Sequence, residues 1–141
     1  MAFTPEDGTG LADANSYSSV DELDSYWVER NIEMSQYTLH DKQCALVEAC
    51  DHIELFFGPN LYGYKASSEQ ALEFPRICLY DSLGKAIEGV PAKVKYAQCE
   101  YAYRILVNGV SLAPDPTRDA TGLQVQATFK KVGPLEKRTT Y

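Results

Sequence analysis

Three segments of the sequence repeat apolar residues at helical spacing, and recognisable capping signals bound each of them. These patterns predict helices over residues 19–31, 39–57 and 92–108. Ser19 and Glu22 form the pattern of a capping box, in which a hydroxyl and a glutamate satisfy backbone N–H groups at a helix start. Short helices gain most of their stability from packing, so we expect a mainly α fold, a small helical bundle of three main helices and short turns.

The second and third predicted helices have equally clear ends. Thr38 is positioned to cap the second helix, and Gly58 followed by Pro59 is expected to stop it. Pro91 suits the first position of the third helix, where a proline loses no hydrogen bond, and Gly109 suits the C-terminal end. The third helix also carries tyrosines away from its apolar stripe, so we expect more than one of its faces to be engaged.

Loops are expected to connect these helices. Residues 4–16 are rich in turn formers, and the pair Gly8 and Gly10 raises the question of a phosphate-binding loop. A dinucleotide-binding loop needs a preceding strand and a third glycine that opens a helix, and this segment has neither. Further along, residues 68–74 are predicted to form a short helical turn and residues 80–84 a reverse turn.

The pattern changes in the last part of the chain. Apolar and polar residues alternate from Leu123 to Phe129, which is the period of a β-strand. We therefore divide the chain into a helical body, residues 1–116, and an extended β-type C-terminal arm, residues 117–141. Fully extended, residues 121–141 would reach about 70 Å. A lone strand exposes backbone hydrogen-bonding groups, so the arm needs a hairpin partner, a place on its own body or a partner chain.

Charge is unevenly distributed along the chain, whose formal net charge is -7. Residues 1–60 hold two basic and twelve acidic side chains, residues 61–117 are balanced, and residues 118–141 carry a net charge of +3. This distribution excludes a generally basic coat for nucleic acid. The simplest interpretation is a solvated surface. The alternative is that acidic and basic regions of neighbouring copies attract each other, or that the arm binds an acidic partner.

The cysteines are expected to be reduced. The sequence has no apolar run long enough for a membrane span and no basic, apolar leader, so we expect a protein that is made in the cytoplasm. Free thiols behave as small buried hydrophobes, and we therefore expect core packing rather than chemistry for all four. They are Cys44, Cys50, Cys78 and Cys99.

Catalytic and metal-binding signatures are not found in the sequence. It has no Gly-x-Ser-x-Gly elbow, no phosphate-binding loop and no His-Glu-x-x-His motif. The one group that resembles a metal site is His40, Cys44, Cys50 and His52. At about 100° per residue on a helix, these side chains spread around the axis and cannot converge on one ion. We expect no enzymatic activity, no cofactor and no metal.

Several segments, taken together, resemble a family of tailed-bacteriophage proteins. The resemblance runs in order over nearly the whole chain, and Phe74 stands where the family often has tryptophan. The matching features are residues 7–17, Tyr26-Trp27 on the first predicted helix, Asp51, residues 70–76, residues 90–95, residues 132–137 and the terminal Tyr141.

Members of this family resemble head–tail connector proteins, the adaptors that form a ring beneath the portal of the capsid. The resemblance implies a virion protein of the neck that binds the portal protein and a tail-completion, stopper or tail-terminator protein. It also implies a homo-oligomeric, twelve-membered ring through whose lumen DNA passes without specific binding. Some members instead carry the label of DnaT-like single-stranded-DNA-binding proteins, and this accessory function is the alternative.

The residues expected to carry the connector function fall into two groups. The first belongs to the arm, where apolar anchors and basic side chains are expected to dock on a neighbouring protomer or the portal: Phe129, Lys130, Lys131, Val132, Pro134, Leu135, Lys137, Arg138 and Tyr141. The second lies on the third predicted helix, where Tyr96, Tyr103 and Arg104 are candidates for the ring interface. A hairpin folded on its own body is the alternative for the arm.

Overall fold

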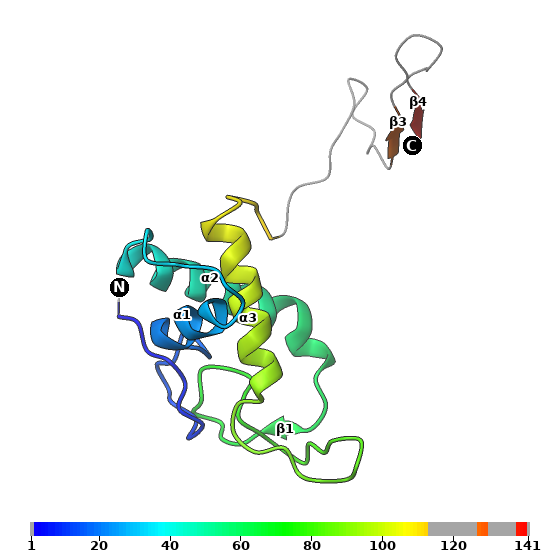
Figure 1. Cartoon of the computed structure of the whole chain (residues 1–141). Coiled ribbons are helices and arrows are strands. Elements are labelled where there is room, and N and C mark those ends of the chain that lie inside the picture. The colour runs from blue at the N-terminus through cyan, green and yellow to red at the C-terminus, as the bar shows by residue number, and fades with distance from the viewer. Residues whose placement is uncertain (1, 113–126, 130–137, 141) are drawn as a thin grey trace.

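The computed structural model describes residues 2–112, 127–129 and 138–140. Within this part of the chain the fold is mainly α, as predicted, with three helices packed into one body (Figure 1). No helix of the described residues has the length and apolar character needed to cross a membrane.

The helices lie close to their predicted positions. α1 covers Val20–Val28, α2 covers Leu39–Phe57 and α3 covers Ala92–Leu106. α2 coincides with its prediction, whereas α1 and α3 end sooner than predicted. For α1 the reason is backbone geometry, since Asn31, inside the predicted range, has a φ of 60°, which a right-handed helix cannot include.

The predicted helix caps are present. The Ser19 hydroxyl accepts a hydrogen bond from the Glu22 backbone N–H at 3.1 Å, and the Glu22 carboxylate accepts one from the Ser19 N–H at 3.4 Å. The Thr38 hydroxyl likewise accepts from the Asp41 N–H at 3.1 Å. Each cap satisfies an N–H group that has no partner inside the helix, and this fixes where α1 and α2 begin.

α2 and α3 lie side by side and run in opposite directions, and α1 packs against both (Figure 1). Near the start of α2, Ala45 borders a hollow together with Ile105 from the end of α3. At the other end of the pair, Ile53 of α2 borders a second hollow with Val94 from the start of α3. The antiparallel pair therefore has two distinct ends.

The buried apolar side chains form two clusters. The first core lies where α1 packs on α2 and α3, and it contains Leu23, Tyr26, Trp27, Met34, Ala45, Leu46, Ala49, Cys99 and Ala102. The second core lies under the N-terminal segment and the loop before α3, and it contains Ala14, Tyr17, Cys50, Ile53, Leu72 and Phe74. α2 contributes to both cores and so joins them.

The connection between α2 and α3 is irregular. A 3₁₀ turn, η1 at Gly58–Asn60, follows α2, and two short strands, β1 at Tyr64–Lys65 and β2 at Arg76–Ile77, pair antiparallel. The Arg76 guanidinium holds this connection together. It donates to the carbonyl oxygens of Tyr62 and Gly63, both at 2.8 Å.

The prediction of a helical turn over residues 68–74 is wrong, because this segment forms turns and bends and no helix. The Gln70 side chain explains the difference. Its Oε1 accepts from the Ser67 N–H at 3.0 Å, and its Nε2 donates to the carbonyl oxygens of Leu72 and Pro75 at 2.7 and 2.9 Å. The side chain thus ties backbone groups on both sides of Gln70 together and holds the segment in a loop conformation. The predicted reverse turn at residues 80–84 is confirmed, with the Asp81 carboxylate accepting from two backbone N–H groups.

The C-terminal arm is described at two short strands, β3 at Ala127–Phe129 and β4 at Arg138–Thr140. They pair antiparallel, with Phe129 opposite Arg138. The predicted boundary at residue 116 lies outside the described residues. So do most of the arm positions predicted to bind a partner: Lys130, Lys131, Val132, Pro134, Leu135, Lys137 and Tyr141.

The cysteines divide into two kinds, and all four are free thiols. Cys50 and Cys99 are buried in the cores, as predicted, but the prediction of core packing is wrong for Cys44 and Cys78, which are exposed. Cys44 lies on the outer side of α2, and Cys78 lies in the loop after β2 with a φ of 58°. The apolar residues around these two cysteines in the sequence therefore do not indicate that their thiols are buried in a core.

Candidate functional site

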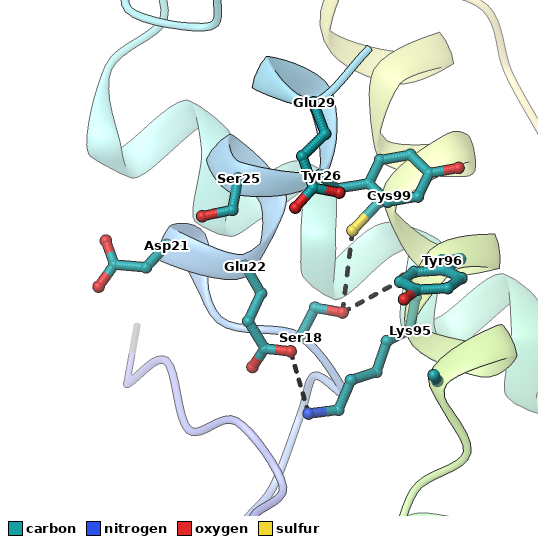
Figure 2. A pocket seen from close by; sticks show the side chains of 10 residues that line it. Ser18, Asp21, Glu22, Ser25, Tyr26, Glu29, Lys95, Tyr96 and Cys99 are labelled. Carbon is teal, nitrogen blue, oxygen red and sulfur yellow. Dashed lines mark hydrogen bonds and ion pairs between the residues drawn. The ribbon is translucent and has the colours of Figure 1, made fainter.

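A polar groove of about 340 Å³ lies between α1 and α3 (Figure 2). We call it the α1–α3 groove. Acidic and hydroxyl side chains from α1 form one wall, and Lys95 and Tyr96 of α3 form the other. The Lys95 ammonium lies 3.0 Å from the Glu22 carboxylate and spans the groove near its base. The full lining is Ser18, Asp21, Glu22, Ser25, Tyr26, Glu29, Ala92, Lys95, Tyr96 and Cys99.

A buried glutamine positions the segment that leads into α1. Gln98 of α3 is fully buried, and its Oε1 accepts from the backbone N–H groups of Tyr17 and Ser18 at 3.0 and 2.9 Å. Its Nε2 donates to the Ser16 hydroxyl and to the Leu46 carbonyl oxygen, both at 2.7 Å. All four hydrogen-bonding positions of the amide are used, so the N-terminal segment, α2 and α3 are held at one point.

Stacked aromatic rings form the outer part of the α1–α3 groove. The Tyr26 and Tyr96 ring centroids are 5.3 Å apart, and the Arg30 guanidinium lies 3.6 Å from the Tyr26 centroid. The Tyr26 hydroxyl also donates to the Glu100 carboxylate at 2.8 Å. Burial and this hydrogen bond raise the pKa of Tyr26, so the phenol stays protonated at neutral pH.

The three ring-interface candidates have different environments. Tyr96 is 49% exposed at the mouth of the α1–α3 groove. Arg104 is exposed and pairs with Glu100 one turn earlier, at 3.3 Å. The Tyr103 ring is half-buried against Trp27, with centroids 4.4 Å apart. Tyr96 and Arg104 therefore leave surface free for a partner, whereas much of Tyr103 contributes to the first core.

The groove does not contain an activated nucleophile. Its thiol, Cys99, is buried, and burial raises its pKa to about 11. The thiol remains protonated at neutral pH and is a poor nucleophile. Cys50, in the second core, has its pKa raised to about 12 for the same reason. Neither buried cysteine has the chemistry of a catalytic thiolate.

The histidines and cysteines of α2 point in different directions. The Cys44 sulfur lies 3.5 Å from His40 Nε2 on the exposed start of the helix. His52 lies further along, against the rings of Phe56 and Tyr101 at 4.6 and 4.8 Å. Within the described residues, no group of three or more potential ligands comes together to hold a metal ion.

In the N-terminal loop that contains Gly8 and Gly10, backbone N–H groups surround the Glu6 side chain. The Glu6 carboxylate accepts from the backbone N–H groups of Gly8, Gly10 and Leu11, at 3.0, 2.9 and 3.0 Å. Glu6 is 3% exposed. Its carboxylate therefore occupies the place that a phosphate would take in such a loop. The role of Glu6 was missed in the sequence because its partners are backbone groups, which leave no residue pattern.

A second surface is apolar and lies at the end of the α2–α3 pair where α2 finishes. An apolar groove of about 300 Å³ runs between the two helices there, and Lys93 is its one charged lining residue. Its other lining residues are Ile53, Phe57, Leu61, Phe74, Val94, Ala97 and Tyr101. Phe56, Tyr62 and Tyr64, which are close in sequence to the lining residues Phe57 and Leu61, are also exposed. Exposed apolar surface of this extent is typical of a binding site for another protein.

Comparison with known proteins identifies a family. The model described as "Putative DnaT-like ssDNA binding protein" matches residues 1–141. The chain belongs to this family. No curated protein and no solved structure matches it.

Proposed function

We propose that this chain is a structural connector of a tailed-bacteriophage particle. In this proposal it forms a ring under the portal protein, links the capsid to a tail-completion, stopper or tail-terminator protein, and has no catalytic role. The arm, residues 117–141, docks on neighbouring chains. The sequence resemblance described above supports this function, and two properties of the molecule agree with it.

The observation that carries the proposal is the presence of two unlike apolar ends on the α2–α3 pair. One end exposes Leu55, Phe56 and Phe57, and the other exposes Leu39 and Val107. Exposed apolar side chains at both ends would allow head-to-tail contact between copies, in which one end meets the other. Such heterologous contacts produce a ring when the rotation between copies closes.

The charge of the body supports a DNA conduit. Residues 2–112 carry seventeen acidic and eight basic side chains, a net charge of -9. A ring of such bodies would repel phosphate, so DNA could pass without being held. The basic arm would be attracted to the acidic bodies of its neighbours.

The alternative function is binding of single-stranded DNA, which the description of the family favours. The supporting feature is a set of exposed tyrosines in the connection between α2 and α3, Tyr62, Tyr64 and Tyr80, with Lys65 and Lys85 close by in sequence. Single-strand binders stack bases on such rings inside a basic groove. Against this function, the body as a whole is acidic, with its acidic excess in residues 1–60.

Assembly with the portal protein tests the connector function. We expect the purified chain to add a ring to isolated portal particles in electron micrographs, and Phe56→Asp to abolish the ring because it places a charge in an apolar contact. Leu83→Asp is the matched control, since Leu83 is 91% exposed in a separate loop. A Phe56→Asp variant that assembles as well as the control would contradict the proposal.

Two further experiments test the docking of the arm and the alternative of DNA binding. Deletion of residues 119–141 is expected to abolish portal attachment and infectious particles, and unchanged attachment would show that the arm does not dock.

Titration with a fluorescent single-stranded oligonucleotide at moderate salt is expected to show no micromolar binding. Tight binding that weakens as salt rises would favour the DNA function instead.

A further inference from the structure

We infer that the apolar groove between α2 and α3 receives the C-terminal arm of a neighbouring copy, with the strand that contains Phe129 as its occupant. This inference rests on the proposed ring and names the contact that joins each copy to the next. It is argued from the shape of the groove, the pattern of the arm and the place where the described body ends.

The groove is a gap in the wall of the second core. Ile53 and Phe74 belong to that core and also line the groove, and Val94 and Tyr101 pack against the same cluster. Ile53 and Phe74 are almost fully buried, whereas Phe57 on the rim is 46% exposed. An apolar segment laid in the groove would complete the wall and remove further apolar surface from water.

The arm has the matching pattern. Alternation places Leu123, Val125, Ala127 and Phe129 on one side of an extended strand and polar residues on the other. Such a strand can turn its apolar side to a groove while its polar side stays in water.

The proposed ring favours a neighbouring copy over the same chain. The described body ends at Leu112, after the C-terminal end of α3, whereas the groove lies beside Val94 near the start of that helix. Within one chain the arm would return along α3 for about 20 Å, a distance that its length can span, so the arrangement of copies decides between the two. In a head-to-tail ring, the end that exposes Val107 faces the Phe56 end of the next copy, so the arm starts beside the neighbour's groove. Among the described elements, β3 and β4 contact each other and no helix.

Cross-linking within assembled rings tests the inference. The photoreactive amino acid benzoyl-phenylalanine replaces Phe57 in the full-length chain, and this chain is mixed with the natural chain labelled with ¹⁵N. After irradiation, we expect an unlabelled peptide that contains position 57 to be joined to a labelled peptide from residues 119–141. A labelled arm peptide comes only from another copy, and with the labelled chain in large excess an unlabelled arm peptide identifies the chain's own arm. The same photoreactive group at Leu83, exposed in a separate loop, is the control for chance contact.

Matched substitutions in the arm sharpen the test. Phe129→Asp in the labelled chain is expected to reduce the cross-link several-fold, because it charges the apolar side of the strand. Thr128→Asp, on the alternate side, is expected to leave the yield unchanged. Cross-links to the chain's own arm, to the body of the neighbour, or at no more than the Leu83 level would overturn the inference. Ring size is measured in the same samples, so intact rings without the cross-link contradict this contact alone, whereas absence of rings contradicts the proposed function.

Discussion

The two cores of this molecule are closed in different ways. The first core is covered by a helix: Trp27 of α1 is 5% exposed, and its indole N–H donates to the Cys99 carbonyl oxygen at 3.2 Å. The second core is covered by loops, and its wall is incomplete where Ile53 and Phe74 reach the apolar groove. A helix can supply a continuous apolar face, whereas the loop leaves a gap. One core therefore provides stability, and the other combines stability with a surface for association.

Gln98 joins these two regions, and its loss is expected to have the largest effect. Gln98→Leu removes four hydrogen bonds and leaves the buried N–H groups of Tyr17 and Ser18 unpaired. The Leu46 carbonyl oxygen keeps its helical partner within α2. At roughly 1–3 kcal/mol for each unpaired group, we expect a loss of about 4 kcal/mol or more in the free energy of unfolding. Urea denaturation followed by circular dichroism measures this loss.

The matched control is Gln43→Leu. Gln43 is half-buried on α2, and its side chain makes no hydrogen bond within the described chain. We expect a change of less than about 0.5 kcal/mol. Similar losses for the two variants would mean that the amide of Gln98 is not the joint between the cores.

The difference in closure is tested directly by truncating one side chain in each core. Leu46 is fully buried in the first core, and Ile53 lies in the second core at the apolar groove. We expect Leu46→Ala to cost about 4 kcal/mol and Ile53→Ala about 2 kcal/mol, because side chains beside an open groove can relax into the space. Equal losses, measured by urea denaturation, would show that the second core is packed as rigidly as the first.

Tyr17 connects the second core to its covering loop, and the loss of its hydroxyl should have a smaller effect. This hydroxyl donates to the Glu54 carboxylate and accepts from the Phe74 N–H at 3.3 Å. Tyr17→Phe is expected to cost about 1–2 kcal/mol, because both partners are left without this bond. Cys50→Ala serves as a comparison that removes apolar contact without changing these hydrogen bonds. No loss in Tyr17→Phe would mean that water replaces the hydroxyl.

The same contact predicts a pH dependence. Burial raises the pKa of Glu54 above its ordinary value of 4.5, and the Tyr17 hydroxyl opposes that rise. The folded protein therefore holds this proton more tightly than the unfolded chain does. Protonated Glu54 therefore adds to the free energy of unfolding. This contribution is present below pH 4.5 and is lost as the pH rises through the raised pKa of Glu54. In Tyr17→Phe the decline with rising pH should be steeper. Denaturation curves over this pH range that stay parallel for the two proteins would contradict the assignment.

The smallest effect is expected in the α1–α3 groove, where the Lys95–Glu22 pair is partly exposed. Lys95→Met should cost about 0.2–1 kcal/mol, and the cost should shrink at high salt because the pair is screened. Lys93→Met is the control, since Lys93 makes no ion pair with the described residues. A loss that persists in high salt would point to packing of the Lys95 stem instead.

The sequence predicted the features that depend on neighbouring residues. Ser19, Thr38 and Pro91 marked the helix starts because capping involves groups a few residues apart. It did not predict the structure of residues 68–74, where the Gln70 side chain bonds the backbone instead of a helix forming. The exposure of Cys44 also depends on which side of α2 faces the core, and a thiol fits either environment.

The candidate site was predictable only in part. The position of Tyr96 on a second face of α3 followed from the helical repeat. The stacking of Arg30 on Tyr26 and the gap beside Phe57 depend on how separate segments meet, which a local pattern does not contain. Gln98 showed this most clearly, because in the sequence it is one polar residue on an apolar stripe.

The bonds that Gln98 makes with Tyr17 and Ser18 have a consequence for how the protein is synthesised. These partners are separated by about eighty residues, since Tyr17 pairs with a side chain 81 positions later. A ribosome makes the N-terminal part of a chain first, and contacts this distant in sequence form late. The first helix therefore remains without this anchor until about the first half of α3 has emerged from the exit tunnel. A translational pause before residue 98 would lengthen the time for which the apolar face of α1 is open to chaperones.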